Sequence, residues 1–323
     1  MEELFLTVSQ RRGGYLLRRD LIEMGLDDRH IRHAVRIGLL ERLRHGTYAP
    51  TSITRPLTPE EKHRLLAFAT LDRLGPGVVL SHVTAAVIHT GQSYGADLSR
   101  VHVTRRIGRH ARDVAGVVHH VGRLTDADVV EVDGRPVVTP ARAVIESASV
   151  TNLESGMVTA SFALRVGACT AEELQERLAR HARWPGMLRV RLAVAYAEPA
   201  CETVGEVRSF YMFRRGGLPR PEPQVEIHDA NGQLIARVDA EWLDYRHVWE
   251  FDGMVKYGAL NAGALRPEEV LVREKLREDR IRATERGATR GTWEDLARPV
   301  VTVARIRHDL ERSRRLYVVN RAG

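Results

Sequence analysis

The sequence predicts an α+β protein of several domains, from its length, its order of elements and its acidic strands. The chain has 323 residues, more than one compact core of average size holds, so we expect two or three domains. Residues 8–50 have the pattern helix, helix and hairpin. The chain after residue 200 has the pattern helix, hairpin, strand and helix, and its strands carry acids. Apolar residues make up 43% of the chain, which is typical of packed proteins and argues against global disorder.

Composition narrows the class of protein and its compartment. The chain has 49 basic and 42 acidic residues, a net charge of +7, and this modest bias fits a polyanion such as DNA without requiring one. Cys169 and Cys201 have no metal-ligand spacing, which favours a reducing cytoplasm. The first residues do not have the pattern of a signal peptide. No apolar run approaches the roughly 20 residues needed to cross a bilayer, so we expect a cytoplasmic protein that does not contact a membrane.

The first predicted domain covers residues 1–52. One helix is expected at residues 18–24, where Gly25 stops it. Asp27 can cap a second helix over about residues 28–37. Alternating leucines then lead into a β-hairpin, or wing. This spacing is typical of a winged helix-turn-helix.

The second of these helices has a basic face. Ile31, Ala34 and Val35 fall on one side of it, and the basic residues fall elsewhere. The basic residues are Arg29, Arg32, His33 and Arg36. A helix of that charge fits the major groove of DNA, and Arg42 and Arg44 of the wing are placed to touch phosphates. A small helical subdomain with a solvated basic face would show the same pattern.

Residues 58–150 are predicted to form a small α+β domain, after a proline-rich linker at residues 50–59. A helix is expected over Pro59–Leu74, with acids in its first turn as the helix dipole favours. A strand and then a helix are expected within residues 78–90, and strand-like runs cover residues 101–104, 114–120 and 129–138. Asp133 and Gly134 are a strong hairpin signal. The histidines here lack a ligand pattern, and we interpret them as surface or core residues: His82, His89, His102, His119 and His120.

A helical region is predicted for residues 151–196, and a last domain for residues 197–323. In the helical region Thr170 and Glu173 form a capping box. In the last domain a helix opens near Thr203. Strands are expected at residues 223–228, 235–242 and 247–251, with a hairpin at Asn231-Gly232, and a helix at residues 267–286.

Acids lie close together on two of these strands. Glu250 and Asp252 share one face of their strand, because side chains alternate along a strand. If the two strands are neighbours, Asp239 lies beside them. Three carboxylates this close repel one another unless a cation lies between them, and Mg²⁺ prefers oxygen ligands. The alternative is a pair of ordinary amphipathic strands with acids on the wet face.

The last domain resembles the PD-(D/E)XK nuclease superfamily, and within it the domain related to the very-short-patch-repair endonuclease. The resemblance runs from Glu198 to the C-terminus. Its most specific parts are Arg237-Val-Asp239, Glu250-Phe-Asp-Gly253 and Glu274-Lys-x-Arg-Glu-Asp279. It implies a restriction-endonuclease-like α/β fold and Mg²⁺-assisted cleavage of DNA phosphodiesters.

The resemblance also assigns roles to single residues. Asp239 would be the metal-binding acid and Glu250 the second acid of the signature. The lysine expected two positions later is absent, because Asp252 stands there. The other residues implied are Lys256 or Lys275 as the missing positive charge, and Glu206, or else Glu202, as the helix acid. Glu206 also stands where a capping-box carboxylate belongs, so starting a helix would explain it equally.

Residues 8–150 resemble the winged helix and following domain of AbiEi-like type IV antitoxins. The matching stretches are Gly46-Thr-Tyr48, Leu80-Ser-His-x-Thr-Ala-Ala86 and Thr139-Pro-Ala-Arg142. One expectation is therefore a DNA-binding protein with a Mg²⁺-dependent endonuclease domain, acting in phage or mobile-element defence. The alternative is an antitoxin or transcriptional repressor with a toxin partner and an inactive nuclease fold, and a third is an antitoxin that binds only protein. The absent lysine favours the second, whereas the retained acids favour the first.

Overall fold

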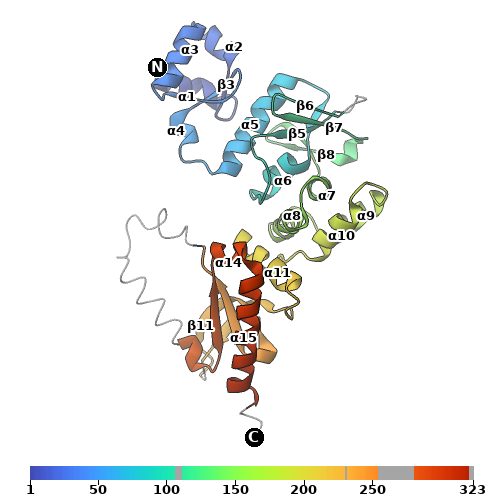
Figure 1. Ribbon diagram of the computed structural model, residues 1–323. Helices are drawn as coiled ribbons and strands as arrows, with labels where there is room; N and C mark the ends of the chain where they lie inside the picture. The colour runs from blue at the N-terminus through green and yellow to red at the C-terminus, as the bar shows by residue number, and fades with distance from the viewer. Residues whose placement is uncertain (106–110, 230, 254–279, 320–323) are drawn as a thin grey trace. The chain divides into compact units, whose positions relative to one another are not determined.

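The computed structural model describes residues 1–105, 111–229, 231–253 and 280–319 (Figure 1). The chain divides into two compact units, residues 1–194 and 195–323. Helices and several separate sheets occur along the chain, so the prediction of an α+β protein with more than one domain is confirmed. The finer boundaries, at residues 52, 58 and 150, stay predictions.

The first unit opens with helices and a small sheet. Its elements are α1 (Glu2–Gln10), β1 (Leu16–Leu17), α2 (Arg18–Glu23), α3 (Asp28–Arg36), β2 (Leu40–Arg44) and β3 (Thr47–Pro50). The strands pair antiparallel in the order β1-β3-β2. Apolar side chains from all of the helices meet in one core: Phe5, Leu16, Leu21, Ile31, Ala34 and Leu40. The two helices and the hairpin expected here are confirmed, and α1 was not predicted.

Asp27 begins α3 as its pattern predicts. Its carboxylate accepts a hydrogen bond from the backbone N–H of His30 at 2.8 Å. The first N–H groups of a helix have no partner within the helix, so this bond stabilises the start of α3. The orientation of α3 is therefore fixed both by a cap and by the core beneath it.

The linker expected at residues 50–59 is shorter than predicted. Pro50 is the last residue of β3, and α4 (Thr51–Thr54) follows directly. The chain then enters α5 (Pro59–Leu74), whose first turn is capped by Thr58, which accepts a hydrogen bond from Glu61 N–H. Threonine and proline are common at helix starts as well as in linkers. In this stretch they belong to a short helix and to the cap of α5.

A larger sheet follows α5 in the first unit. Its strands are β4 (Val78–Leu80), β5 (Val101–Arg105), β6 (Arg112–Val114), β7 (Val117–Val121), β8 (Val129–Val132) and β9 (Arg135–Val138), paired in the order β6-β7-β5-β4-β9-β8. The hairpin expected at Asp133 and Gly134 is confirmed, with φ of 50° and 68°. One strand was expected over residues 114–120, but a turn at Ala115 and Gly116, with φ of 50° and 72°, divides it into β6 and β7.

Helices complete the first unit. They are α6 (His82–Thr90), the short 3-10 helix η1 (Asp126–Asp128), α7 (Pro140–Val150), α8 (Leu153–Arg165), α9 (Ala171–Arg180) and α10 (Met187–Ala195), whose last residue belongs to the second unit. The helical region predicted after residue 150 is confirmed, and so is the capping box of Thr170 and Glu173.

The second unit is built on a sheet with the order β10-β11-β12-β13. Its elements are α11 (Val204–Arg215), β10 (Glu222–His228), β11 (Leu234–Trp242), η2 (Leu243–Tyr245), β12 (His247–Phe251), β13 (Gly287–Gly291), α14 (Trp293–Ala297) and α15 (Pro299–Tyr317). β12 pairs antiparallel with β11 and parallel with β13. Phe213 of α11 packs edge-on against Trp242 and Trp249, which holds the helix to the sheet.

Several C-terminal elements were not predicted from the sequence. They are β13, α14 and α15. The helix expected at residues 267–286 lies mostly outside the described residues. Across the part of the chain described here, no helix has the length and apolar character needed to cross a membrane.

Candidate functional site

The exposed face of α3 is basic. Ile31 and Ala34 are buried beneath the helix. The basic side chains predicted to contact DNA are all exposed: Arg29, Arg32, His33 and Arg36. Nη2 of Arg36 lies 2.9 Å from Nδ1 of His33, so these two side chains share one surface. The amphipathic pattern read from the sequence is therefore present in the structure.

Two acids lie at the start of α3. The guanidinium of Arg18 donates two hydrogen bonds of 2.8 Å to the carboxylate of Asp28, and this contact lowers the pKa of Asp28. Asp27 lies beside it as the cap. Asp28 is thus engaged by Arg18, which is not part of the basic face of α3.

The two arginines predicted for the wing differ in their surroundings. Arg42 is exposed. Arg44 is partly buried, and its Nη1 donates a hydrogen bond to Thr70 of α5 at 3.2 Å. Burial lowers the pKa of Arg44, with a smaller contribution from Arg73. Arg44 therefore faces the body of the unit, and we leave it out of the proposed interface.

In the second unit, β11 and β12 bring two of the predicted acids together. The register pairs Ala240 with Trp249, and its next step places Asp239 opposite Glu250. Oδ2 of Asp239 accepts a hydrogen bond from the backbone N–H of Phe251 at 2.6 Å. Asp252 follows directly, and its backbone N–H donates to the carbonyl of Gly291 in β13. The three predicted strand acids thus lie at one end of the β11–β12 pair.

Glu206 is buried at the start of α11 and is held by other residues. Its Oε1 accepts a hydrogen bond from the Thr203 hydroxyl, and its Oε2 accepts from Glu202 N–H and from the Gln224 amide, each at 2.8 Å. The side chain of Glu202 binds Arg237 at 2.7 Å. These contacts account for Glu206 as a carboxylate that starts a helix, which was one of the two roles open from the sequence.

The metal site stays a prediction. Within the described residues, no group of three or more His, Cys, Asp and Glu side chains has an arrangement that could hold a metal ion. The oxygens of Glu206 are taken up by its donors, which does not fit a ligand of Mg²⁺. Lys256 and Lys275 lie outside the described residues. We therefore derive no reaction step through a metal ion.

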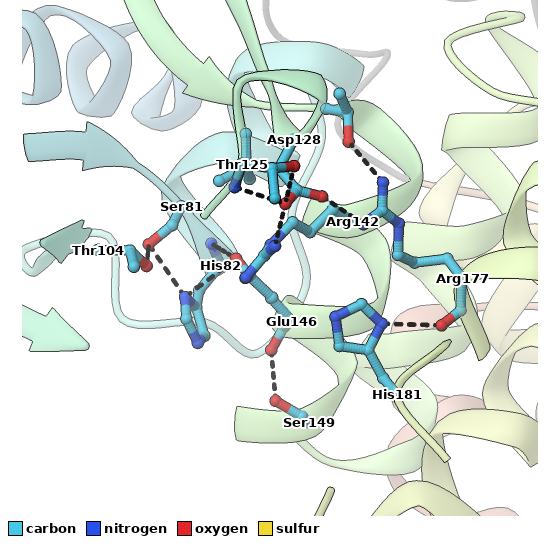
Figure 2. Close-up of polar contacts among 12 residues, drawn as sticks. Ser81, His82, Thr104, Thr125, Asp128, Arg142, Glu146, Ser149, Arg177 and His181 are labelled. Atoms are coloured by element: carbon cyan, nitrogen blue, oxygen red, sulfur yellow. Dashed lines mark hydrogen bonds and ion pairs between the residues drawn. The ribbon is translucent and has the colours of Figure 1, made fainter. Parts of the chain in front are cut away.

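A buried network of charged side chains in the first unit was not predicted. Arg142 of α7 lies between two acids, with Nη1 at 3.0 Å from Asp128 and Nε at 2.6 Å from Glu146 (Figure 2). Arg177 of α9 binds the second oxygen of Asp128 at 2.5 Å. Oε2 of Glu146 accepts the backbone N–H of His82 at 3.2 Å. The network thereby links η1, α6, α7 and α9.

Burial and hydrogen bonding act in opposite directions on the two acids of this network. Burial raises the pKa of Asp128, but hydrogen bonds from Thr125 and Arg177 and the charge of Arg142 outweigh it, so the net shift is downward. At Glu146 burial dominates, and its pKa is raised despite the contact with Arg142. Asp128 is therefore firmly ionised, and it needs its arginines because an unpaired charge is costly in the interior.

Three of the histidines that lack a ligand pattern in the sequence lie together beside this network. The rings of His82 and His120 stack with their centroids 3.4 Å apart, and Nδ1 of His102 lies 2.9 Å from Nε2 of His120. His82 opens α6 with a φ of 51°, a conformation uncommon outside glycine. Burial, and then the other imidazoles, lowers the pKa of His102 to about 3, and burial and His119 lower that of His120 to about 4. The imidazoles are therefore neutral near pH 7.

The feature of the sequence that bears on this cluster is the alternation of side chains between the two faces of a strand. Thr104 pairs with His120 and His102 pairs with Val118 in parallel register, so residues two apart on each strand share a face. Which strands are neighbours is not readable from the spacing, because β5 and β7 are separated by β6 in the chain.

Comparison with known proteins identifies the class of the first domain. Residues 4–51 match the family described as "Transcriptional regulator, AbiEi antitoxin". The chain therefore carries an AbiEi antitoxin and transcriptional regulator domain at its N-terminus, as the resemblance implied. The nuclease-like resemblance of the second unit stays a prediction.

Longer matches come from Mycobacterium tuberculosis. The uncharacterized proteins Rv2248 (strain ATCC 25618 / H37Rv) and MT2308 (strain CDC 1551 / Oshkosh) are each 26% identical over 222 residues, which covers 68% of this chain and 76% of theirs. The crystal structure of RV2827C protein from the same species is 18% identical, with a TM-score of 0.38, over 59% of this chain and 75% of that chain.

Removing the central arginine of the buried network should destabilise the first unit. Arg142→Ala leaves Asp128 and Glu146 without their shared partner, which we expect to cost about 3–5 kcal/mol of unfolding free energy. Urea unfolding followed by circular dichroism measures this change. The control is Arg180→Ala, which removes an exposed ion pair with Glu176 and should change stability by about 0.5 kcal/mol or less. Equal losses for the two variants would contradict the importance of the network.

The stacked histidines should make the protein sensitive to acid. The unfolded chain has ordinary imidazole pKa values near 6.5, whereas His102 and His120 titrate near 3 and 4 when folded. Between these values the unfolded chain binds more protons, so stability falls as pH drops from about 6.5 to 4. The slope is at most about 1.4 kcal/mol per pH unit for each histidine. Urea unfolding at pH 7 and pH 4.5 should show a smaller loss for His102→Gln, and an unchanged loss for His45→Gln, an exposed histidine.

Proposed function

We propose that the protein is a DNA-binding transcriptional regulator of the AbiEi antitoxin type, with α3 as its recognition helix. The family match to residues 4–51 supports this proposal. The order of elements supports it as well, because α2 and α3 are joined by a short turn and followed by the β2–β3 hairpin. This order corresponds to a winged helix-turn-helix, in which the second helix enters the major groove and the hairpin lies beside the phosphate backbone.

The exposed basic face of α3 is the observation that carries the proposal. Arg32 and Arg36 are one helical turn apart and exposed on the same side, away from Ile31 and Ala34 in the core. An arginine can donate two hydrogen bonds to the edge of a guanine base, and it also binds phosphates. Arg42, which is exposed on β2, would contact the DNA backbone.

The same family match supports an antitoxin role. In that role the protein would act on a toxin partner and repress transcription, in a system of phage or mobile-element defence. The second unit, whose sequence resembles the nuclease superfamily, would then have a role other than cleaving DNA.

A second function, cleavage of DNA with Mg²⁺ as cofactor, rests on the acids of β11 and β12. Asp239 and Glu250 come together by strand register although 10 residues separate them in the chain. The order of α11, β10, β11 and β12 follows the helix, hairpin and acidic strand on which the sequence resemblance rests. We place this function behind the first, because Asp252 replaces the signature lysine.

Loss of the two central arginines of α3 should weaken DNA binding. We expect Arg32→Ala with Arg36→Ala to lower the affinity for duplex DNA. If both arginines bind phosphates, the slope of log K against log salt becomes shallower by about 2, since each lost phosphate contact contributes about 0.9. Fluorescence anisotropy at several salt concentrations measures both quantities.

The matched control for this experiment is Arg180→Ala with Arg183→Ala. It removes two arginines that are exposed on and just after α9, and the net charge changes equally. If this variant lost as much affinity as the α3 variant, binding would follow overall charge, and the assignment of α3 would be wrong.

Cleavage is tested by incubating the protein with supercoiled plasmid and Mg²⁺ or Mn²⁺. An active nuclease domain predicts nicking by the wild type and loss of nicking in Asp239→Ala and in Glu250→Ala. The control Glu226→Ala removes an exposed acid of β10 in the same sheet and should nick as the wild type does. Absence of nicking by the wild type, or equal nicking by all variants, would exclude the second function.

A further inference from the structure

A cavity of about 410 Å³ lies in the first unit between the N-terminal AbiEi domain (residues 4–51), which is the proposed DNA-binding domain, and the sheet domain, which comprises α5 to β9. Its walls come from the end of α1, from α4, from α5 and from the turn between β8 and β9. A volume of this size falls within the range of small-molecule sites, which often lie where domains meet.

Part of the cavity lining is apolar. It is formed by Ile53, Leu57, Leu65 and Phe68. Burial of an apolar group against these side chains would remove hydrocarbon surface from water, which is favourable in proportion to the area covered. This part of the lining therefore favours a ligand with an apolar body.

The cavity is also lined by charged side chains, namely Arg11, Arg12, Arg64, Arg135, Glu61 and Asp133. Arg64 binds Asp133 at 2.5 Å, and the carboxylate of Glu61 accepts a hydrogen bond from the backbone N–H of Thr58. Arg12 and Arg135 contact Asp20 and Asp72, which do not line the cavity. Arg11 is the exposed arginine of this lining, so it is the cation that a bound anion would reach.

Two of the arginines also lie against the ring of Phe68. The guanidinium carbon of Arg135 lies 4.8 Å from the centre of the Phe68 ring, and that of Arg64 lies 5.4 Å from it. Guanidinium groups stack on aromatic faces and donate in the plane to carboxylates or sulfonates. A ligand with an aromatic body and one acidic group would meet both requirements.

The cavity adjoins a polar junction between the two domains. Arg12 binds Asp20 with two hydrogen bonds of 2.7 Å and reaches Asp72 of α5 at 3.3 Å. Tyr15 donates to Asp72 at 2.5 Å and accepts from Arg135 at 2.8 Å. A ligand against Arg135 would therefore act directly on the contacts that fix the DNA-binding domain to α5.

We propose that this cavity binds a small organic anion with an aromatic or apolar body, and that its occupancy changes the affinity of the protein for DNA. The binding half of the inference stands on the cavity alone. The second half rests on the proposed DNA-binding function, because a coupling needs both sites.

Binding is tested on the full chain with 8-anilinonaphthalene-1-sulfonate, whose fluorescence rises in an apolar site. We expect one probe per folded chain. Leu57→Trp, which fills the cavity, and Arg11→Glu, which reverses the charge of its exposed arginine, should each weaken binding by about tenfold or more. Arg55→Glu is the matched control, because Arg55 is exposed two residues before Leu57 and does not line the cavity. Circular dichroism checks that each variant is folded.

Coupling is tested by anisotropy with a labelled duplex from the region upstream of the protein's own coding sequence. Saturation with the probe should change the DNA dissociation constant by about fivefold or more in the wild type and in Arg55→Glu. In Leu57→Trp the constant should no longer respond to the probe.

The outcomes separate the two halves of the inference. Equal probe binding by wild type, Leu57→Trp and Arg11→Glu would overturn the cavity as the site. Probe binding that depends on the cavity, with a DNA constant that does not respond, would overturn the coupling. If the wild type bound no duplex while the cavity still bound the probe, the proposed function would fail and the binding half would stand.

Discussion

The middle of the first unit depends on one buried cation. Arg142 is almost fully enclosed and lies between Asp128 and Glu146, so three ionisable groups leave water together. Such a group is tolerated only when its geometry is complete, because each unpaired member would carry a large desolvation cost. The contact therefore fixes the position of α7 relative to η1, and through the backbone of His82 it also fixes the start of α6. This contact therefore sets how η1, α6 and α7 pack against one another.

The neighbouring histidines are neutral mainly because they are buried. His82 lies beside Arg142 and against His120, and its pKa is held well below its ordinary value by burial, by the other imidazoles and by that arginine. A second positive charge at this place would face a fixed one at short range and low polarity. The uncharged rings of His82 and His120 therefore stack, and those of His102 and His120 share a hydrogen bond. Arg142 and the histidine cluster are two parts of one electrostatic arrangement.

The sequence predicted the features whose cause is local. The cap at Asp27 and the turn at Asp133 and Gly134 each depend on a few adjacent residues, and both occur as expected. The features that were missed have distant causes. β13 pairs with β12 across roughly 40 residues of chain, and Arg177 meets Asp128 from 49 residues away. Neither partner can be read from a window of sequence, because the pairing is decided by packing of the whole unit.

Charged residues on amphipathic helices and strands fall into two groups, those with hydrogen-bond partners inside the fold and those exposed to solvent. The carboxylates of Glu206 and Asp239 accept hydrogen bonds from backbone N–H groups. A structural role in the fold is therefore enough to explain these two acids. The arginines on the outer face of α3 are exposed to solvent, and surface charges of this kind contribute little to stability. These arginines are therefore available to contact a polyanion such as DNA. This contrast is why the basic helix, and not the acidic strands, carries the proposed function.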